Sequence, residues 1–238
     1  MIYPAIIFTA MGGIALFMAI FVIPKMLDIF REFDAKLPLP TRILIAVTDA
    51  LQNPIIVTIA ITTITTLVIS FSAAMKRSYG FRRNVHAGLL RLPIIGGVMK
   101  QINLAQFSMT LSSLLQSTVP IISALESTGR TCGNILYRES IAKAAEAMKS
   151  GEQLSEILRL HPRLYPPMVT EMIMVGERTG QVDHLLEELS TFYGKEVDHT
   201  MKNFSTIIEP IIILMLGIGV AGLAVAVVMP TFALVQNF

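Results

Sequence analysis

The chain has 238 residues, of which 53% are apolar and only 15% are charged, and its formal net charge is +2. Soluble domains carry about 25% charged residues, so this composition favours a membrane protein, and the near-neutral charge gives no reason to expect a nucleic-acid partner. The one cysteine, Cys132, excludes an internal disulfide framework. We expect it to be a packed or surface residue with no redox role.

Three windows of the sequence are apolar enough to cross a bilayer, whose hydrocarbon core of about 30 Å needs about 20 residues. The windows are Ile2–Ile23, Asn53–Met75 and Ile207–Met229, and the only charge within them is Glu209. We therefore predict transmembrane helices over residues 1–23, 53–75 and 207–229. The alternative for the first window is a signal peptide, but a basic n-region and a small-residue exit are missing.

The basic residues predict the direction of these helices. Between Met75 and Lys100 lie six basic residues and no acidic one, whereas residues 24–52 carry four of each sign. Lys and Arg gather on the cytoplasmic side of inner membranes. We expect residues 76–206 to be cytoplasmic, and the loop 24–52 and the tail 230–238 to be external. The basic segment would also attract anionic lipid headgroups.

The segment 76–206 has the pattern of a helical bundle. Apolar residues recur there at the spacing of one face of an α-helix. The clearest stripes are Leu104, Phe107, Leu111 and Leu114; Tyr137, Ile141, Ala144, Ala145 and Met148; and Val182, Leu185, Leu186, Leu189, Phe192, Tyr193 and Val197. No segment alternates as a strand does. The expected fold class is all-α, with three transmembrane helices and one cytoplasmic bundle of about six helices.

Local signals divide this segment into helices. Pro120 suits a first helical turn, Gly133-Asn134 reads as a stop followed by an N-cap, and Gly151 marks another break. The run HPRLYPP, His161–Pro167, is predicted to be a loop.

The sequence offers little that could carry catalysis. It contains no phosphate-loop pattern, no GxGxxG after a strand, no HExxH and no Gly-x-Ser-x-Gly. His184 and Glu188, spaced i, i+4, could share a metal, and Glu171, Glu177 and Asp183 could bind a hard cation, although ordinary surface contacts explain both groups. We predict no catalytic residue, no cofactor and no metal site, and interpret the chain as a non-enzymatic scaffold.

Two of the predicted spans carry packing signals. In the third, Gly217, Ala221 and Ala224 form a stripe of small residues that would let another helix approach closely. In the second, hydroxyl side chains recur every four residues, at Thr58, Thr62, Thr66 and Ser70. They indicate either a helix–helix seam or hydroxyls bonded to their own helix carbonyls.

Several stretches resemble one family in order along the chain. The two strongest are VGERTGQVDHLLEELSTFYGKEV, Val175–Val197, and IIEPIIILMLGIGVAGLAVAVVMPTF, Ile207–Phe232. IYPA at Ile2–Ala5, LPLPTR at Leu37–Arg42 and FSMTLSSLLQSTVPIISAL at Phe107–Leu125 fit as well. Together they resemble the type II secretion F-domain family, the inner-membrane platform proteins of type II secretion systems and type IV pilus machines.

The resemblance implies a function and a set of partners. Such a subunit would couple a cytoplasmic assembly ATPase to the insertion of pilin or pseudopilin, alongside accessory inner-membrane proteins. It would be a homo-oligomer in the bilayer of a bacterial inner membrane, with an external C-terminus. Whether the machine serves secretion, a pilus or DNA uptake stays open. The alternatives are a membrane-anchored adaptor or sensor, and an oligomeric transporter or pore subunit that uses Glu209.

The chain departs from this family at two points. Family members usually have a small residue and a glycine before the Val-Pro pair, where this chain has Ser117-Thr118. Glycine admits a positive φ that threonine disfavours, so the departure bears on the backbone conformation of this turn. The family also has two copies of the helical domain, whereas this chain resembles its C-terminal two-thirds, through truncation, a split gene or a misplaced start.

Two further sites are predicted near the third span. We expect Gly176 and Gly180 to make a tight corner before the last helix, with Glu177 capping or bonding across it, or else contacting a partner. That helix is expected to continue from about Gln181 into the third span. Pro210 would remove a backbone bond to residue 206 and bend it, and Glu209 would need a cationic partner or lie in the headgroup zone.

Overall fold

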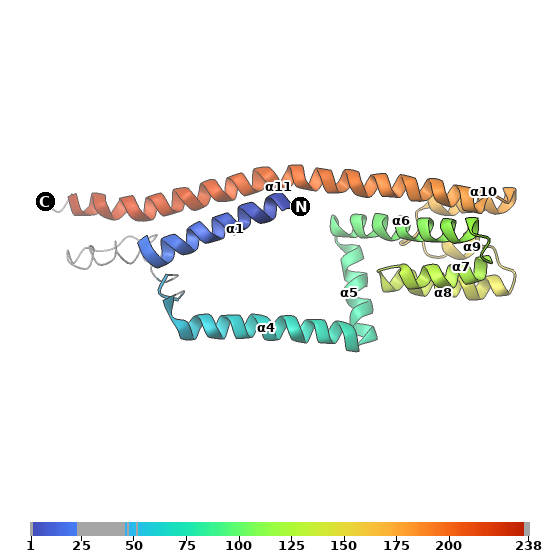
Figure 1. Ribbon diagram of the computed structural model, residues 1–238, viewed down its shortest axis with the longest axis horizontal. Helices are drawn as coiled ribbons and strands as arrows, with labels where there is room; N and C mark the ends of the chain where they lie inside the picture. The colour runs from blue at the N-terminus through green and yellow to red at the C-terminus, as the bar shows by residue number, and fades with distance from the viewer. Residues whose placement is uncertain (1, 23–45, 47, 51, 236–238) are drawn as a thin grey trace. The chain divides into compact units, whose positions relative to one another are not determined.

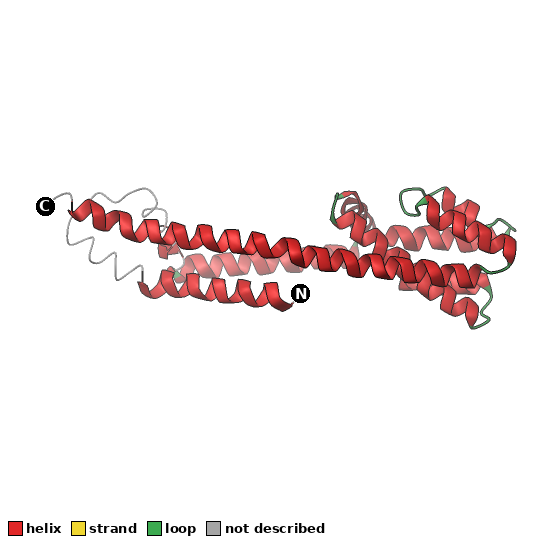
Figure 2. Ribbon diagram, turned by 90° about the horizontal axis from the view of Figure 1, so that it is seen from above, coloured by secondary structure: helices red, strands yellow, loops and turns green. Residues whose placement is uncertain are grey.

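The computed structural model describes residues 2–22, 46, 48–50 and 52–235. These residues form helices joined by short loops and contain no strand, as Figure 2 shows. The prediction of an all-α fold is confirmed for this part of the chain. The expected loop 24–52, including the LPLPTR motif, falls mostly outside the described residues.

The chain divides into two compact units (Figure 1). Unit 1 comprises Met1–Phe71 and Asn203–Phe238, and unit 2 comprises Ser72–Lys202. The last helix, α11, runs without interruption from Val182 to Val235 and so contributes residues to both. The prediction of one continuous helix into the third apolar segment is confirmed, and the helix extends beyond the expected end of that segment at Met229.

The described part of unit 1 consists of apolar helices. They are α1 (Ile2–Phe17), a π-helical turn η1 (Met18–Val22), most of α4 (Pro54–Arg77) and the C-terminal part of α11. Two helices, α4 and the Val182–Gly222 part of α11, are long and apolar enough to cross a membrane. Large aliphatic side chains stand exposed along both, such as Ile64 and Ile213. Exposed rows of this kind are expected of helices that contact lipid.

Unit 2 is a bundle of short helices closed by the first turns of α11 (Figure 1). Its complete helices are α5 (Tyr79–Arg91), α6 (Ile95–Gln116), α7 (Ile121–Thr131), α8 (Ile135–Lys149), α9 (Leu154–Arg159) and α10 (Pro167–Thr179). From α5 to α10, each helix contacts the one that follows it in the chain, and α5 also contacts α8.

The predicted stripes supply the core of unit 2. Phe107, Leu111, Tyr137 and Ile141 are fully buried, because they occupy the inner faces of α6 and α8. From α11 the core receives Leu186, Leu189 and Tyr193, whereas Phe192 of the same stripe is 42% exposed. Burial of such apolar area is the main stabilising contribution to a bundle of this kind.

The helix ends follow the local signals. The Asn134 side chain caps α8 by accepting a hydrogen bond from the Leu136 N–H, as predicted. Gly151 has a φ of +89° after α8. One boundary was wrong: Pro167 belongs to the first turn of α10 and not to the preceding loop. Proline fits there because that position needs no N–H donor.

Candidate functional site

The corner between α10 and α11 is built on two glycines. Gly180 ends α10 in the left-handed conformation, with φ +71°. The N–H groups of Gly180 and Gln181 both donate to the Gly176 carbonyl oxygen. A Cβ on Gly176 would lie 2.9 Å from Val182 Cα. The chain can therefore turn this tightly only with glycine at both positions.

Glu177 reaches from this corner to the start of α9. Its carboxylate accepts hydrogen bonds from the backbone N–H of Leu154 at 2.6 Å and of Ser155 at 3.3 Å, and from the Ser155 hydroxyl. Gln153, at the N-cap position of α9, makes no capping bond with its own side chain. Glu177 therefore supplies the cap from 23 residues away in the sequence, and its negative charge suits a helix N-terminus.

The other five predicted site residues lie along α11. Glu209, Pro210, Gly217, Ala221 and Ala224 are all exposed. Gly217 has no atom within 4 Å of a Cβ built upon it. The structure thus brings together Gly176, Glu177 and Gly180 but leaves the remaining five on an open helix surface.

The hydroxyl face of α4 is equally open. Thr58, Thr62, Thr66 and Ser70 are exposed, and the Thr62 hydroxyl donates to the Thr58 carbonyl oxygen at 2.7 Å. For Thr62 the interpretation as a hydroxyl bonded to its own helix therefore holds.

Two of the three acidic residues considered as ligands of a hard cation, Glu171 and Glu177, have protein partners. Glu171 forms an ion pair with Arg159 at 3.0 Å, and Glu177 caps α9. His184 and Glu188 lie 3.6 Å apart on the exposed face of α11. The described residues contain no group of three or more His, Cys, Asp or Glu side chains suited to a metal ion.

The titratable groups of the core are locked in their neutral forms. Burial raises the pKa of the Cys132 thiol to about 11, so the thiol is not activated. Burial also raises the pKa values of Tyr137 and Tyr165. The Tyr137 hydroxyl donates to the Leu164 carbonyl oxygen at 2.6 Å, and the Tyr165 hydroxyl is hydrogen-bonded to the Ser140 hydroxyl at 2.8 Å. Both bonds join the loop before α10 to α8.

Polar contacts also tie α5 to α8. Tyr79 donates to Glu139 at 2.6 Å, and Arg83 Nε donates to the same carboxylate at 3.2 Å. Partial burial acts to raise the pKa of Glu139, but the hydrogen bonds from Tyr79 and Arg83 outweigh it, so that the pKa is lowered overall. His86 Nδ1 accepts the Ile135 N–H at 3.0 Å. Desolvation, then the nearby charges of Arg82 and Arg138, lowers the pKa of His86 and favours this neutral acceptor.

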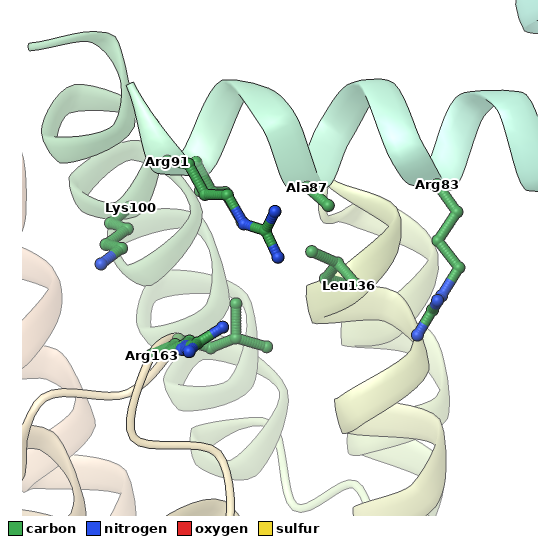
Figure 3. A pocket seen from close by; sticks show the side chains of 8 residues that line it. Arg83, Ala87, Arg91, Lys100, Leu136 and Arg163 are labelled. Carbon is green, nitrogen blue, oxygen red and sulfur yellow. The ribbon is translucent and has the colours of Figure 1, made fainter. Parts of the chain in front are cut away.

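A cavity of about 750 Å³ lies between these elements and is bordered by positive charge (Figure 3). We call it the basic cavity. Its cationic lining is Arg83 and Arg91 of α5, Lys100 of α6 and Arg163 of the loop before α10, and its apolar lining is Ala87, Leu90, Leu136 and Leu164. Figure 3 shows Arg91 extending from α5 into the space bordered by Leu136 and Arg163, while Arg83 turns toward α8.

Sequence reasoning found only part of this cavity. The run of basic residues up to Lys100 predicts membrane topology and attraction to lipid headgroups, but not a cavity. The sequence places Arg163 in a loop, and no local pattern indicates that this loop folds back toward α5. The Tyr137 bond to the Leu164 carbonyl oxygen fixes that approach.

Comparison with known proteins gives a consistent family. Residues 107–230 match the model of the family described as type II secretion system (T2SS), protein F. The match covers α7–α10 entirely, the C-terminal part of α6 from Phe107 onward and most of α11.

Curated relatives match almost the whole chain. The type IV pilus assembly protein PilC of Thermus thermophilus is 34% identical over 99% of this chain and 57% of its own length. The PilC of Pseudomonas aeruginosa is 30% identical over 98% of the chain and 62% of its own length. The type II secretion system protein F of P. aeruginosa is 29% identical over 99% of the chain and 57% of its own length. The chain thus spans about three-fifths of each relative.

Proposed function

This chain belongs to the family of type II secretion system protein F, and on that premise we propose that it is a non-enzymatic subunit of the inner-membrane platform of a type IV pilus or type II secretion machine. Its role is to couple a cytoplasmic assembly ATPase to the insertion of pilin or pseudopilin subunits. The observation that carries this proposal is the match to PilC proteins across almost the entire chain.

The proposed topology has three membrane spans. They are α1 with η1, α4 and the apolar part of α11, with unit 2 in the cytoplasm and the C-terminus outside. The length and apolar character of α4 and α11 support two of the spans. The six basic residues that end at Lys100 support the cytoplasmic side for unit 2.

A scaffold role also agrees with the chemistry of unit 2. Its buried titratable side chains are neutral tyrosines and a thiol with a raised pKa. Its charged groups are mostly exposed, and several form ordinary surface ion pairs, such as Arg159 with Glu171. Surfaces of this kind suit binding to partner proteins, with α11 as the element that joins unit 2 to the membrane segment.

The proposal is tested by co-purification. The full chain in mild detergent is mixed with the cognate assembly ATPase, and the captured ATPase is quantified. A chimera that carries the N-terminal part of the T. thermophilus relative is tested in parallel, and an unrelated polytopic membrane protein serves as the control. Capture by the chain or the chimera, above the control, is the expected result. Capture by neither, with both proteins folded, would contradict the platform role.

A further inference from the structure

We propose that the basic cavity is a binding site for a phosphate-bearing ligand. The cavity brings together cations from three separate parts of unit 2: Arg91 of α5, Lys100 of α6 and Arg163 of the loop before α10. The lining also includes Arg83, and none of the described residues that line the cavity is acidic.

Only one of these four cations is neutralised within the described chain. Arg83 pairs with Glu139 at 3.2 Å, outside the lining. The charged groups of Arg91, Lys100 and Arg163 have no hydrogen-bonding or ionic partner among the described residues. Three like charges around one cavity repel each other, and an anion placed between them removes that repulsion. Guanidinium groups fit phosphate oxygens well, because they donate parallel hydrogen bonds.

The elements that carry these cations, α5, α6 and the loop before α10, are held in place by contacts with their neighbours. The His86–Ile135 bond and the Glu139 contacts join α5 to α8. The Tyr137 bond to Leu164 holds the loop that carries Arg163. At the junction of α5 and α6, a Cβ on Gly96 would lie 2.4 Å from the Leu90 carbonyl oxygen. Glycine at this position therefore lets the start of α6 pack closely against the end of α5. The cavity is thus preorganised, which lowers the entropic cost of binding.

The apolar residues that line the cavity indicate what else the ligand can contain. Ala87, Leu90, Leu136 and Leu164 give the cavity an apolar side, and its volume of about 750 Å³ is within the usual range for small-molecule sites. The ligand therefore carries a phosphate or pyrophosphate group, which the cations bind, and the apolar side of the cavity accommodates any less polar portion attached to it.

Two sources can supply this chemistry: a phospholipid headgroup or a soluble phosphate compound. Exposed aliphatic side chains at the α5–α6 corner, Leu92 (45%), Ile94 (63%) and Ile95 (47%), directly follow Arg91. Cations beside exposed aliphatic groups are typical of protein surfaces that bind at the membrane interface. The experiment separates the two sources.

The test measures binding to the full chain in a neutral detergent. One arm titrates phosphatidylglycerol and counts retained lipid by native mass spectrometry; the other titrates pyrophosphate and follows binding by calorimetry. The variant is Arg91→Gln with Arg163→Gln, and the charge-matched control is Arg130→Gln with Arg178→Gln. All four side chains are exposed, so the fold should survive, which circular dichroism verifies.

We expect the Arg91/Arg163 variant to lower affinity about tenfold or more, and the control to change it less than about twofold. Loss in the lipid arm alone assigns the site to a headgroup, and loss in the pyrophosphate arm alone assigns it to a soluble phosphate compound. No binding in either arm, or equal losses in variant and control, would overturn the proposal. The assay needs no ATPase or pilin, so its outcome is independent of the platform role.

Discussion

The carboxylate of Glu177 lies 2.6 Å from the backbone nitrogen of Leu154 and caps a helix that has no capping side chain of its own. The same residue sits between the two glycines of the α10–α11 corner. One side chain therefore links the start of α9 to the geometry of the last helix. Glu177, which belongs to a family motif in the sequence, thus stabilises unit 2 by capping α9.

We expect Glu177→Ala to lower the free energy of unfolding by about 1–2 kcal/mol, because it removes a charged cap and leaves two N–H groups without an acceptor. Thermal unfolding of the full chain in detergent measures this as a lower midpoint. Glu152→Ala is the control, since Glu152 is exposed in the loop before α9. Equal midpoints for the two variants would contradict the capping role.

Thr118 has a φ of +60°, the only positive φ at a non-glycine residue in the described chain. A β-branched residue is strained in that conformation, at a cost of about 1–3 kcal/mol. Thr118→Gly should therefore raise the unfolding midpoint. Ser117→Gly is the matched control, because Ser117 has a φ of −83° and should give no gain. A midpoint that falls in Thr118→Gly would show that the strain is not relieved there.

Gly176→Ala should destabilise the chain by about 1–3 kcal/mol, because its Cβ would press on Val182 at 2.9 Å. Gly194→Ala, in the N-terminal part of α11 with nothing within 4 Å of its Cβ, should stabilise it by up to about 1 kcal/mol. Chemical denaturation of both variants tests this difference in sign. The same sign for both would mean that the corner can relax.

The Cys132 thiol should resist alkylation in the folded protein. It is buried, and its pKa is about 11, so at pH 8 almost all of it is the unreactive protonated form. Because this pKa is raised above the value in the unfolded chain, the thiol favours the folded state below pH 9 and loses that effect as the pH rises toward 11. Labelling with a maleimide at pH 8, with and without denaturant, measures the protection. Fast labelling of folded protein would contradict it.

Under the platform proposal, Glu209→Ala should reduce assembly of the machine without reducing the amount of protein. Glu209 is exposed beside Pro210, and a carboxylate there needs a cationic or hydrogen-bonding partner in an apolar setting. Pilus or pseudopilus assembly and protein level are measured together. Asp198→Ala, an exposed acidic residue earlier in the same helix, provides the comparison. Normal assembly with Glu209→Ala would remove this role.

Features fixed by neighbouring residues were the most predictable from the sequence. The stripe from Tyr137 to Ala145 and the Asn134 cap depend on local spacing and local hydrogen bonds, and both are present. At Thr118 the sequence leaves the backbone open, because the resemblance suggests a glycine conformation that threonine disfavours, and the surrounding structure imposes the positive φ all the same. The capping of α9 by Glu177 and the approach of Arg163 to α5 depend on contacts distant in sequence, which periodicity does not report.

The shared helix α11 also has a consequence for synthesis. The last residues that the core of unit 2 requires are Leu186, Leu189 and Tyr193, at the beginning of α11. The apolar part of the same helix is translated only afterwards. Chains emerge from the ribosome N-terminus first, and domains fold as units as they emerge. The bundle thus has every core side chain it needs before the final apolar segment leaves the ribosome, so completion of its fold does not have to wait for that segment's insertion.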